Sequence, residues 1–154
     1  MAIDERRGIA NEHGRPWQGK LPTDLRHFRE ATQHGIVVMG YRTHEEEFAR
    51  PLSDRRNLVA THTAQPLRPG FEALNDVEGF LRQTTEDVWI IGGAGLFASS
   101  LSFADELDIT KLQGNFACTK FFPTYETDFN KIFESEPIEE NGITFQFTRW
   151  LRKA

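Results

Sequence analysis

Residues Ile36 to Gly40 read IVVMG, and this short stretch decides the class of fold. A continuous, largely β-branched apolar run of this length is typical of a strand that is covered on both faces, as in a parallel sheet. Two later runs have the same character, NLVAT at 57–61 and VWIIGG at 88–93. The sequence therefore predicts several neighbouring strands of a buried sheet.

Helical patterns lie between and beside these runs. Residues 24–33 and 75–83 repeat apolar side chains at helical spacing, with Asn75 as a candidate N-cap of the second segment. The apolar positions are Leu25, Phe28 and Ala31 in the first segment and Val77, Phe80 and Leu81 in the second. Alternating strands and helices favour an α/β fold, with a largely parallel sheet and helices on its faces.

The C-terminal part of the chain has a different period. ITFQFT at 143–148 alternates apolar and polar side chains, which predicts a half-buried strand that ends or bulges near Thr148. The preceding Asn141-Gly142 pair predicts a hairpin turn from a strand near residues 130–137. We therefore expect a mixed sheet, mainly parallel, with an antiparallel hairpin at its C-terminal edge.

Composition restricts the class of ligand. A chain of 154 residues fits one domain, and we expect that domain to span residues 1–154. A net charge of −5 argues against nucleic acid or an anionic membrane as the partner, because both require a basic surface. A small molecule is the expected partner.

Cysteine and histidine placement indicates the compartment and the absence of a metal site. The one cysteine, Cys118, cannot form an internal disulfide, and MAIDERR at the start has no apolar run of signal-peptide length. We expect a cytoplasmic protein. No metal is expected, because no histidine pair has i, i+4 spacing with a third ligand, and surface placement is expected for most of four histidines: His13, His27, His34 and His44.

Asp24, in LPTDLRHFR at 21–29, opens the first predicted helix. An aspartate there commonly caps the helix or balances its dipole. However, Phe28 lies one turn further along on the face that also carries Leu25, so the carboxylate leans toward apolar surroundings. A carboxyl group so placed could instead bind a protonated heterocycle or assist protonation near neutral pH.

Two further motifs suggest anion recognition. In WIIGGAGLFA at 89–98 a buried strand runs into a double glycine and a short helix, which suits either a phosphate-binding turn or a turn that needs glycine for its backbone angles. Cationic side chains gather near the ends of the strands at 36–40 and 57–61, where they are either solvated or positioned to bind anions. They are Arg42, Arg50, Arg55, Arg56 and His62.

Taken in order, a series of segments resembles dihydrofolate reductases over almost the whole chain. The segments are PW, LPTDLRHFR, VVMGYRT, RPLSDRRNLVATH, WIIGGAGLF, LDITKL and TKFFPTYE. The resemblance implies the dihydrofolate-reductase-like fold and reduction of 7,8-dihydrofolate to 5,6,7,8-tetrahydrofolate by hydride transfer from NADPH. It further implies a monomer that binds antifolate inhibitors.

The resemblance also implies roles for individual residues. Asp24 matches the acid that binds the pterin ring and promotes its protonation, Thr110 the threonine that bonds this acid, and Trp17 the lid tryptophan. The implied substrate-binding residues are Ile3, Leu25, Phe28, Leu52, Arg55 and Ile91, with Arg55 pairing with the glutamate tail. The implied cofactor-binding residues are Ile9, Gly40, Arg42, Thr43, Thr61, His62, Gly92, Gly93, Gly95, Leu96 and Phe97.

Two alternatives stay open at the level of sequence. A reductase of riboflavin synthesis, acting on a ribosylated pyrimidine, shares the fold implied by the resemblance, but such proteins usually lack a lid tryptophan paired with LPxD. A catalytically idle folate- or nucleotide-binding module is the other alternative, because the family's first strand normally extends upstream of the point that matches Ile3. Dihydrofolate-dependent NADPH oxidation would separate these cases.

Overall fold

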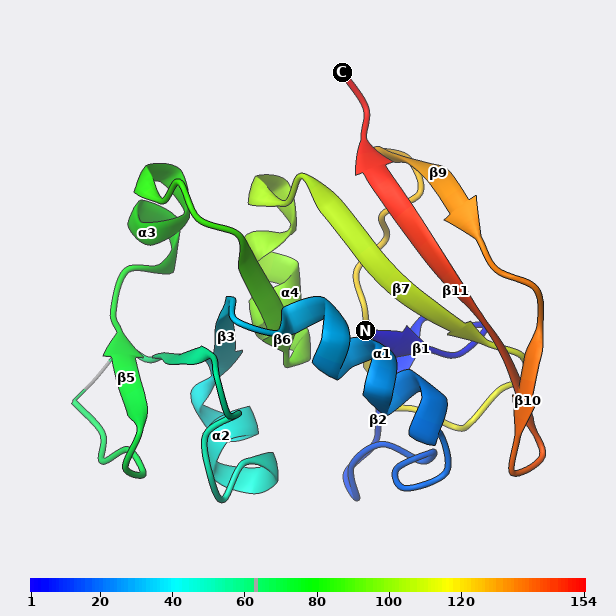
Figure 1. Cartoon of the computed structure of the whole chain (residues 1–154), viewed down its shortest axis with the longest axis horizontal. Helices are drawn as coiled ribbons and strands as arrows, with labels where there is room; N and C mark the ends of the chain where they lie inside the picture. The colour runs from blue at the N-terminus through cyan, green and yellow to red at the C-terminus, as the bar shows by residue number, and fades with distance from the viewer. Residues whose placement is uncertain (63) are drawn as a thin grey trace. The chain divides into compact units, whose positions relative to one another are not determined.

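The computed structural model describes residues 1–62 and 64–154. Its labelled elements are shown in Figure 1, and they form two compact units, Met1–Phe28 with Ala104–Ala154, and Arg29–Phe103. The helices are α1 (Pro22–Thr32), α2 (Tyr41–Glu47), α3 (Val77–Gln83), α4 (Ala94–Ser100) and the 3-10 turn η1 (Leu101–Phe103). The strands are β1 (Ala2–Ile3), β2 (Gly8–Ala10), β3 (Ile36–Gly40), β4 (Arg56–Ala60), β5 (Phe71–Leu74), β6 (Val88–Gly92), β7 (Glu106–Leu112), β8 (Lys120–Phe121), β9 (Phe129–Glu134), β10 (Ile138–Glu140) and β11 (Ile143–Arg152).

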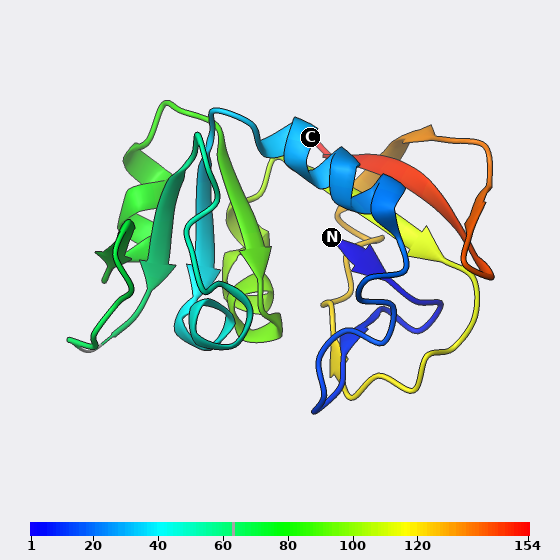
Figure 2. The same ribbon diagram turned by 60° about the horizontal axis from the view of Figure 1, so that its bottom comes forward.

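The unit Arg29–Phe103 contains the parallel sheet that the apolar runs predict. Its strands lie in the order β5-β4-β3-β6, and every pair is parallel. In Figure 2 the arrowheads of β3, β4 and β6 point to one edge of the sheet. The three predicted strands are β3, β4 and β6, so this part of the prediction is confirmed.

Strand β3 is buried on both faces because each face has its own apolar cluster. Val37 and Met39 belong to one cluster, while Ile36 and Val38 belong to the other. Alternate residues of a strand point to opposite faces, so a strand covered on both sides needs apolar residues at every position. This requirement explains the uninterrupted run at the start of IVVMG.

The other unit contains a mixed sheet in the order β1-β7-β11-β10, with β9 also paired to β11. Strand β1 is parallel to β7, and the remaining pairs are antiparallel. A separate antiparallel pair joins β2 to β8. Residues 8–23 contain three glycines and two prolines with no clear period, which predicts a loop, but strand β2 forms at the start of this segment.

The C-terminal hairpin forms at the predicted turn. Asn141 and Gly142 have φ angles of 50° and 79°, as a tight hairpin turn requires, and they connect β10 to β11. The β9–β11 pairing is irregular between Arg149 and Trp150, next to the predicted bulge at Thr148. However, the single strand expected near residues 130–137 is wrong: two strands, β9 and β10, occur here, separated by a segment that includes Pro137.

The cap of the third helix differs from the prediction. The N-cap of α3 is Asp76, whose carboxylate accepts a 2.9 Å hydrogen bond from the Gly79 amide, and not Asn75. Both residue types are good caps, so their order in the sequence could not decide between them. Within the described ranges, no helix has the length and apolar character needed to cross a bilayer.

Candidate active site

Asp24 and Thr110 come together in the first unit although they are 86 positions apart in the sequence. Asp24 lies in the first turn of α1, and Thr110 lies on β7 with 1% of its surface exposed. The Thr110 hydroxyl donates a 2.6 Å hydrogen bond to Asp24 Oδ1. This bond orients a half-buried carboxylate, and no described residue donates a hydrogen bond to its second oxygen, Oδ2.

The side of α1 that contacts the sheet is not the side inferred from the apolar spacing. Leu25 is 56% exposed, so the expectation that this residue is buried on the helix face is wrong. With 3.6 residues per turn, Asp24, His27 and Phe28 form one stripe, and Leu25 lies about 100° away from Asp24. A role for Leu25 as a pocket wall remains a prediction, and an exposed apolar side chain suits it.

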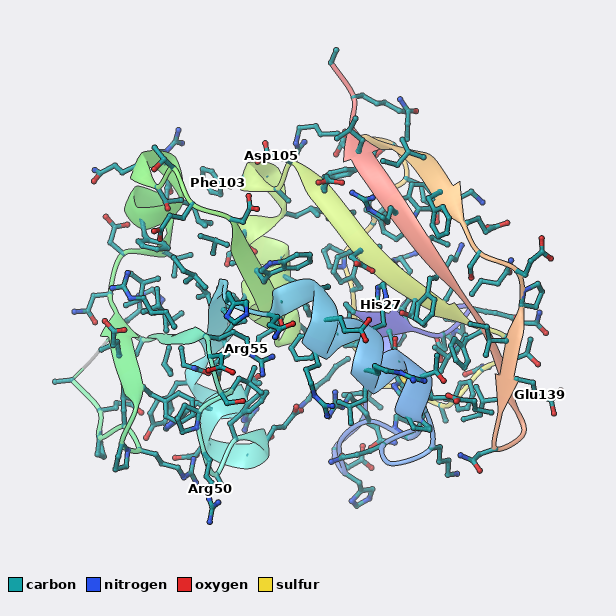
Figure 3. The ribbon with its side chains drawn as sticks, viewed as in Figure 1. His27, Arg50, Arg55, Phe103, Asp105 and Glu139 are labelled. Carbon is teal, nitrogen blue, oxygen red and sulfur yellow. The ribbon has the colours of Figure 1, made fainter. Side chains whose placement is uncertain are left out.

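His27 lies one turn after Asp24 and projects from α1 toward β7 (Figure 3). Its Nε2 atom lies 3.0 and 3.1 Å from the two carboxylate oxygens of Asp108, and its ring stacks on Phe147 with centroids 4.2 Å apart. The hydrogen bond to Asp108 raises the pKa of His27 against the opposing effect of burial, and the negative charges of Asp108 and Asp24 add to the rise. Burial opposes ionisation of Asp108, but the bond from His27 holds its pKa below the ordinary value.

The sequence-based prediction missed this pair and expected most histidines at the surface. The correction also applies to His44, which is 2% exposed and whose Nε2 accepts a 3.2 Å hydrogen bond from the Arg68 amide. The spacing of residues in the sequence did, however, contain information on the His27–Asp108 pair. His27 follows Asp24 by three residues on a helix, and Asp108 precedes Thr110 by two on a strand, so each pair of residues shares a face.

Three further predicted residues of this unit, Trp17, Ile3 and Ile9, are buried, and Phe28 is half-buried. Trp17 is 4% exposed and packs edge-on against Phe116, with ring centroids 5.4 Å apart. Ile3 lies on β1 opposite Lys111, directly after the Ala2–Thr110 pair, and Ile9 lies on β2. Trp17 shares an apolar cluster with residues from the loop and both long strands: Ala2, Leu21, Leu112, Cys118, Ile143 and Phe145.

In the second unit, the glycine turn lies where β6 ends beside β3. Met39 is in register with Gly92, and the Gly92–Gly93 peptide bond is cis. A side chain at Gly40 would lie 3.7 Å from the Gly92 carbonyl oxygen, and one at Gly93 would meet Thr43 Oγ1 at 3.4 Å.

Helix α4 begins directly after this turn, with Gly93 as its N-cap and no side-chain cap. Apart from chain neighbours and the helix's own backbone, no described atom lies within 4 Å of the position that a Cβ at Gly95 would occupy. Uncapped amides beside side-chain-free backbone give a phosphate close access to hydrogen-bond donors. The residues present therefore fit the pyrophosphate of a dinucleotide.

The remaining predicted cofactor residues lie in different surroundings. The Arg42 side chain is exposed and forms an ion pair with Glu46 at 3.4 Å, and His62 is also exposed. Thr61 is buried at the end of β4, and its amide donates to the Leu74 carbonyl oxygen. Two predicted residues lie on α4, Leu96 half-buried and Phe97 buried.

The Arg55 side chain is held by two neutral acceptors, and the negative charge of Asp54 only partly offsets the lowering of its pKa. Its Nη1 donates to Thr32 Oγ1 and its Nε to the Ser53 carbonyl oxygen, both at 2.9 Å. Burial lowers the pKa of Arg55, and the positive charge of Arg29 adds to the effect. By contrast, Arg56 forms a two-pronged pair with Glu72, so the two neighbouring arginines differ in their availability to an anion.

Leu52 and the β6 residue Ile91, the last predicted substrate residues, both pack against the apolar cluster on one face of the parallel sheet. Their cluster contains Val37, Met39, Val59 and Phe71. Arg55 (Figure 3) also lines an open cavity of about 800 Å³ that reaches His34 and Trp89.

Among the described residues, no group of three or more histidine, cysteine or acidic side chains is arranged to hold a metal.

Comparison with known proteins agrees with this arrangement. A family model described as dihydrofolate reductase matches residues 1–152. The dihydrofolate reductase of Staphylococcus aureus is 31% identical over 156 residues, covering 99% of this chain and 96% of the relative. That of Bacillus subtilis (strain 168) is 29% identical over 158 residues, covering 99% and 92%.

A solved structure is similar over the same length. It is described as dihydrofolate reductase from Enterococcus faecalis complexed with NADP(H) and RAB-propyl, and it is 27% identical. The TM-score is 0.87, with 99% of this chain and 94% of the other covered, which confirms the predicted fold class. On the whole-length family match, this chain is a member of the dihydrofolate reductase family.

Proposed function

We propose that this protein carries out the reaction of its family, reduction of 7,8-dihydrofolate to 5,6,7,8-tetrahydrofolate with NADPH, and that Asp24 is the acid of the site. The observation that carries the proposal is the hydrogen bond from Thr110 to Asp24 Oδ1. It orients the only carboxylate that the family resemblance assigns to the pterin ring.

The two oxygens of the Asp24 carboxylate are proposed to have different partners, Thr110 and the pterin ring. The Thr110 hydroxyl occupies one carboxylate oxygen, so Oδ2 is left to accept hydrogen bonds from the amidine edge of the pterin. A charge-assisted bond of this kind favours the protonated ring, which is the form that accepts hydride. Trp17 is proposed to order a water over the substrate, and its burial in the apolar cluster supports a fixed indole position.

NADPH, when bound, supplies the hydride. We propose that Gly92, Gly93 and Gly95 admit its phosphates, because the start of α4 offers uncapped amides and little side-chain bulk. The relative from Enterococcus faecalis was solved with NADP(H), which supports the same cofactor here. The other proposed contacts are Ile9, Gly40, Arg42, Thr43, Thr61, His62, Leu96 and Phe97.

For the substrate, Arg55 is proposed to pair with the glutamate tail, because it is partly desolvated and its side chain donates to two neutral acceptors, the Thr32 hydroxyl and the Ser53 carbonyl oxygen. The proposed apolar contacts are Ile3, Leu25, Phe28, Leu52 and Ile91. Antifolates that imitate the pterin ring should bind the same residues, and the relative solved with RAB-propyl supports this expectation.

Residues 1–154 are proposed to act as one monomeric domain in the cytoplasm. The family model spans nearly the whole chain, which supports one domain, and Cys118 is a free, buried thiol, which suits a reducing compartment. Fractionation of cells with an antibody against the chain, and mass measurement in solution, test these two points.

The experiment that tests the function follows NADPH absorbance with and without dihydrofolate. Asp24→Asn should keep the affinity for NADPH but lose most turnover at neutral pH, with partial recovery in acid, where the substrate arrives already protonated. Asp105→Asn is the matched control, because Asp105 is exposed (Figure 3). Lack of dihydrofolate-dependent oxidation by the parent protein, or equal turnover of Asp24→Asn and parent, would contradict the proposal.

A further inference from the structure

Helix α1 is fastened to β7 by two side-chain hydrogen bonds. Asp24 accepts from Thr110 at 2.6 Å, and His27 lies 3.0 Å from Asp108. The helical residues are three apart and the strand residues two apart, so each pair lies on one face of its element. As the helix numbering rises the strand numbering falls, and the two bonds therefore act as successive rungs between antiparallel elements.

The His27–Asp108 bond does not contact Oδ2 of Asp24, the oxygen that is proposed to bind the pterin ring. It nevertheless restrains the helix face from which Asp24 projects. Rotation of α1 about its axis displaces both bonds, because Asp24 and His27 project from one side of the helix. The Phe147 ring stacks on the His27 imidazole, with the two ring planes inclined by only 21°. This stacking restrains the orientation of the imidazole. Phe147 is itself in register with Thr110 across β7 and β11.

We propose that His27 and Asp108 form a positioning pair that holds the Asp24 carboxylate in its reactive orientation, and that this positioning is strongest when His27 is protonated. The proposal rests on the function proposed for Asp24. A charged donor bonds a carboxylate more strongly than a neutral imidazole does. The His27–Asp108 bond therefore holds α1 against β7 more strongly at low pH than at high pH.

The charges around His27 fit this behaviour. Asp108 faces it from β7 and Asp24 lies on its own helix, and both favour the protonated ring. Against them stands the Met1 ammonium group, which donates to the Asp108 carbonyl oxygen at 2.8 Å. Arg149 of β11 lies near Asp108 and favours its carboxylate form. Arg149 is already paired with Glu106 at 2.5 Å, so its charge is largely balanced.

The test compares His27→Gln and His27→Leu with the parent protein. Gln keeps a donor that can reach Asp108 but never carries a charge, while Leu removes the bond. His27→Leu should lower the single-turnover reduction rate at neutral pH by about tenfold, since small displacements of a reacting group cost this much or more. His27→Gln should recover most of the rate, and Arg82→Gln, which breaks the exposed Glu78–Arg82 pair, should match the parent.

The pH profile separates positioning from mere stability. The ratio of the parent rate to the His27→Gln rate should be largest in acid, and it should approach one as the pH rises and the parent histidine loses its proton. A ratio that does not change with pH, or a His27→Leu rate within about twofold of the parent's at every pH, would overturn the proposal.

A second measurement needs no turnover. Binding of a 2,4-diaminopyrimidine antifolate, followed by calorimetry, reports the Asp24 carboxylate directly, and His27→Leu should weaken it about tenfold. If the parent fails to oxidise NADPH but His27→Leu still weakens this binding, the proposed reaction is wrong and the positioning pair stands. If binding is unchanged in His27→Leu, the positioning pair is wrong, whatever the parent's activity.

Discussion

The Glu140 carboxylate accepts hydrogen bonds from both the backbone amide and the hydroxyl of Thr23. Thr23 is the second residue of α1, and its amide is one of the groups that a helix leaves without an internal partner. Glu140 ends β10, at the tip of the C-terminal hairpin, where the next residue, Asn141, donates to the Lys20 carbonyl oxygen at 2.7 Å. The hairpin tip thus holds the N-terminus of the helix that carries Asp24.

Glu140→Ala should therefore destabilise the protein by about 1 kcal/mol, the usual cost of losing a helix cap, because the Thr23 amide loses its acceptor and the helix dipole its negative partner. Urea unfolding measures the change. Glu139→Ala is the matched control, since Glu139 is exposed on the same strand (Figure 3). Equal midpoints for the two variants would contradict the capping role.

Arg55→Leu should raise KM for dihydrofolate by about 10- to 100-fold while changing kcat little, because a lost arginine–carboxylate pair costs binding far from the reacting carbon. Steady-state kinetics measure both constants. Arg56→Leu is the control, because Arg56 is paired with Glu72. A substrate analogue that lacks the glutamate should be insensitive to Arg55→Leu, and a loss confined to kcat would refute the tail contact.

The His27–Asp108 pair should make stability depend on pH. The folded pKa of His27 lies above its ordinary value of 6.5, so the contribution of His27 is fully present below about pH 6.5 and is lost as the pH rises through the folded value. The folded pKa of Asp108 lies below its ordinary 3.8, so its contribution is present above about that pH and is lost in stronger acid.

The free energy of unfolding of the parent, relative to His27→Gln, should therefore be largest between about pH 4 and pH 6.5 and should shrink toward alkaline pH. Chemical denaturation at a series of pH values measures this difference. A difference that grows with rising pH would have the wrong sign for a protonated histidine bound to a carboxylate.

Cys118 should resist thiol reagents in the folded protein. Burial raises the pKa of its thiol to about 11, and the negative charge of Asp4 adds to the rise, so almost no thiolate exists near neutral pH. The Asp4 side chain is itself held by the amides of Arg6, Gly8 and Phe116. Labelling with an aromatic disulfide should be slow in buffer and fast in denaturant, and fast labelling of the folded chain would show that the thiol is accessible.

The parallel sheet was predictable because local chemistry alone specifies it. A strand covered on both faces needs apolar residues at every position, and IVVMG meets that need in the sequence itself. The Asn141-Gly142 turn was equally readable, because it needs two positive φ angles, which few residue pairs tolerate. Asp24 could be selected as a candidate acid, but its local sequence alone favoured a simple helix cap.

Only the tertiary structure decided which groups bond Asp24 and its neighbours. Helical spacing defines which residues of α1 share a face, but it does not say which face the rest of the chain covers. The exposure of Leu25 could not be predicted from the spacing for this reason. The bonds from Thr110 to Asp24 and between Asp108 and His27 join β7 to α1 across more than 80 positions. Local spacing shows that Asp24 and His27 share a helix face and that Asp108 and Thr110 share a strand face, but the pairing of these two faces follows from the packing of the helix on the strand.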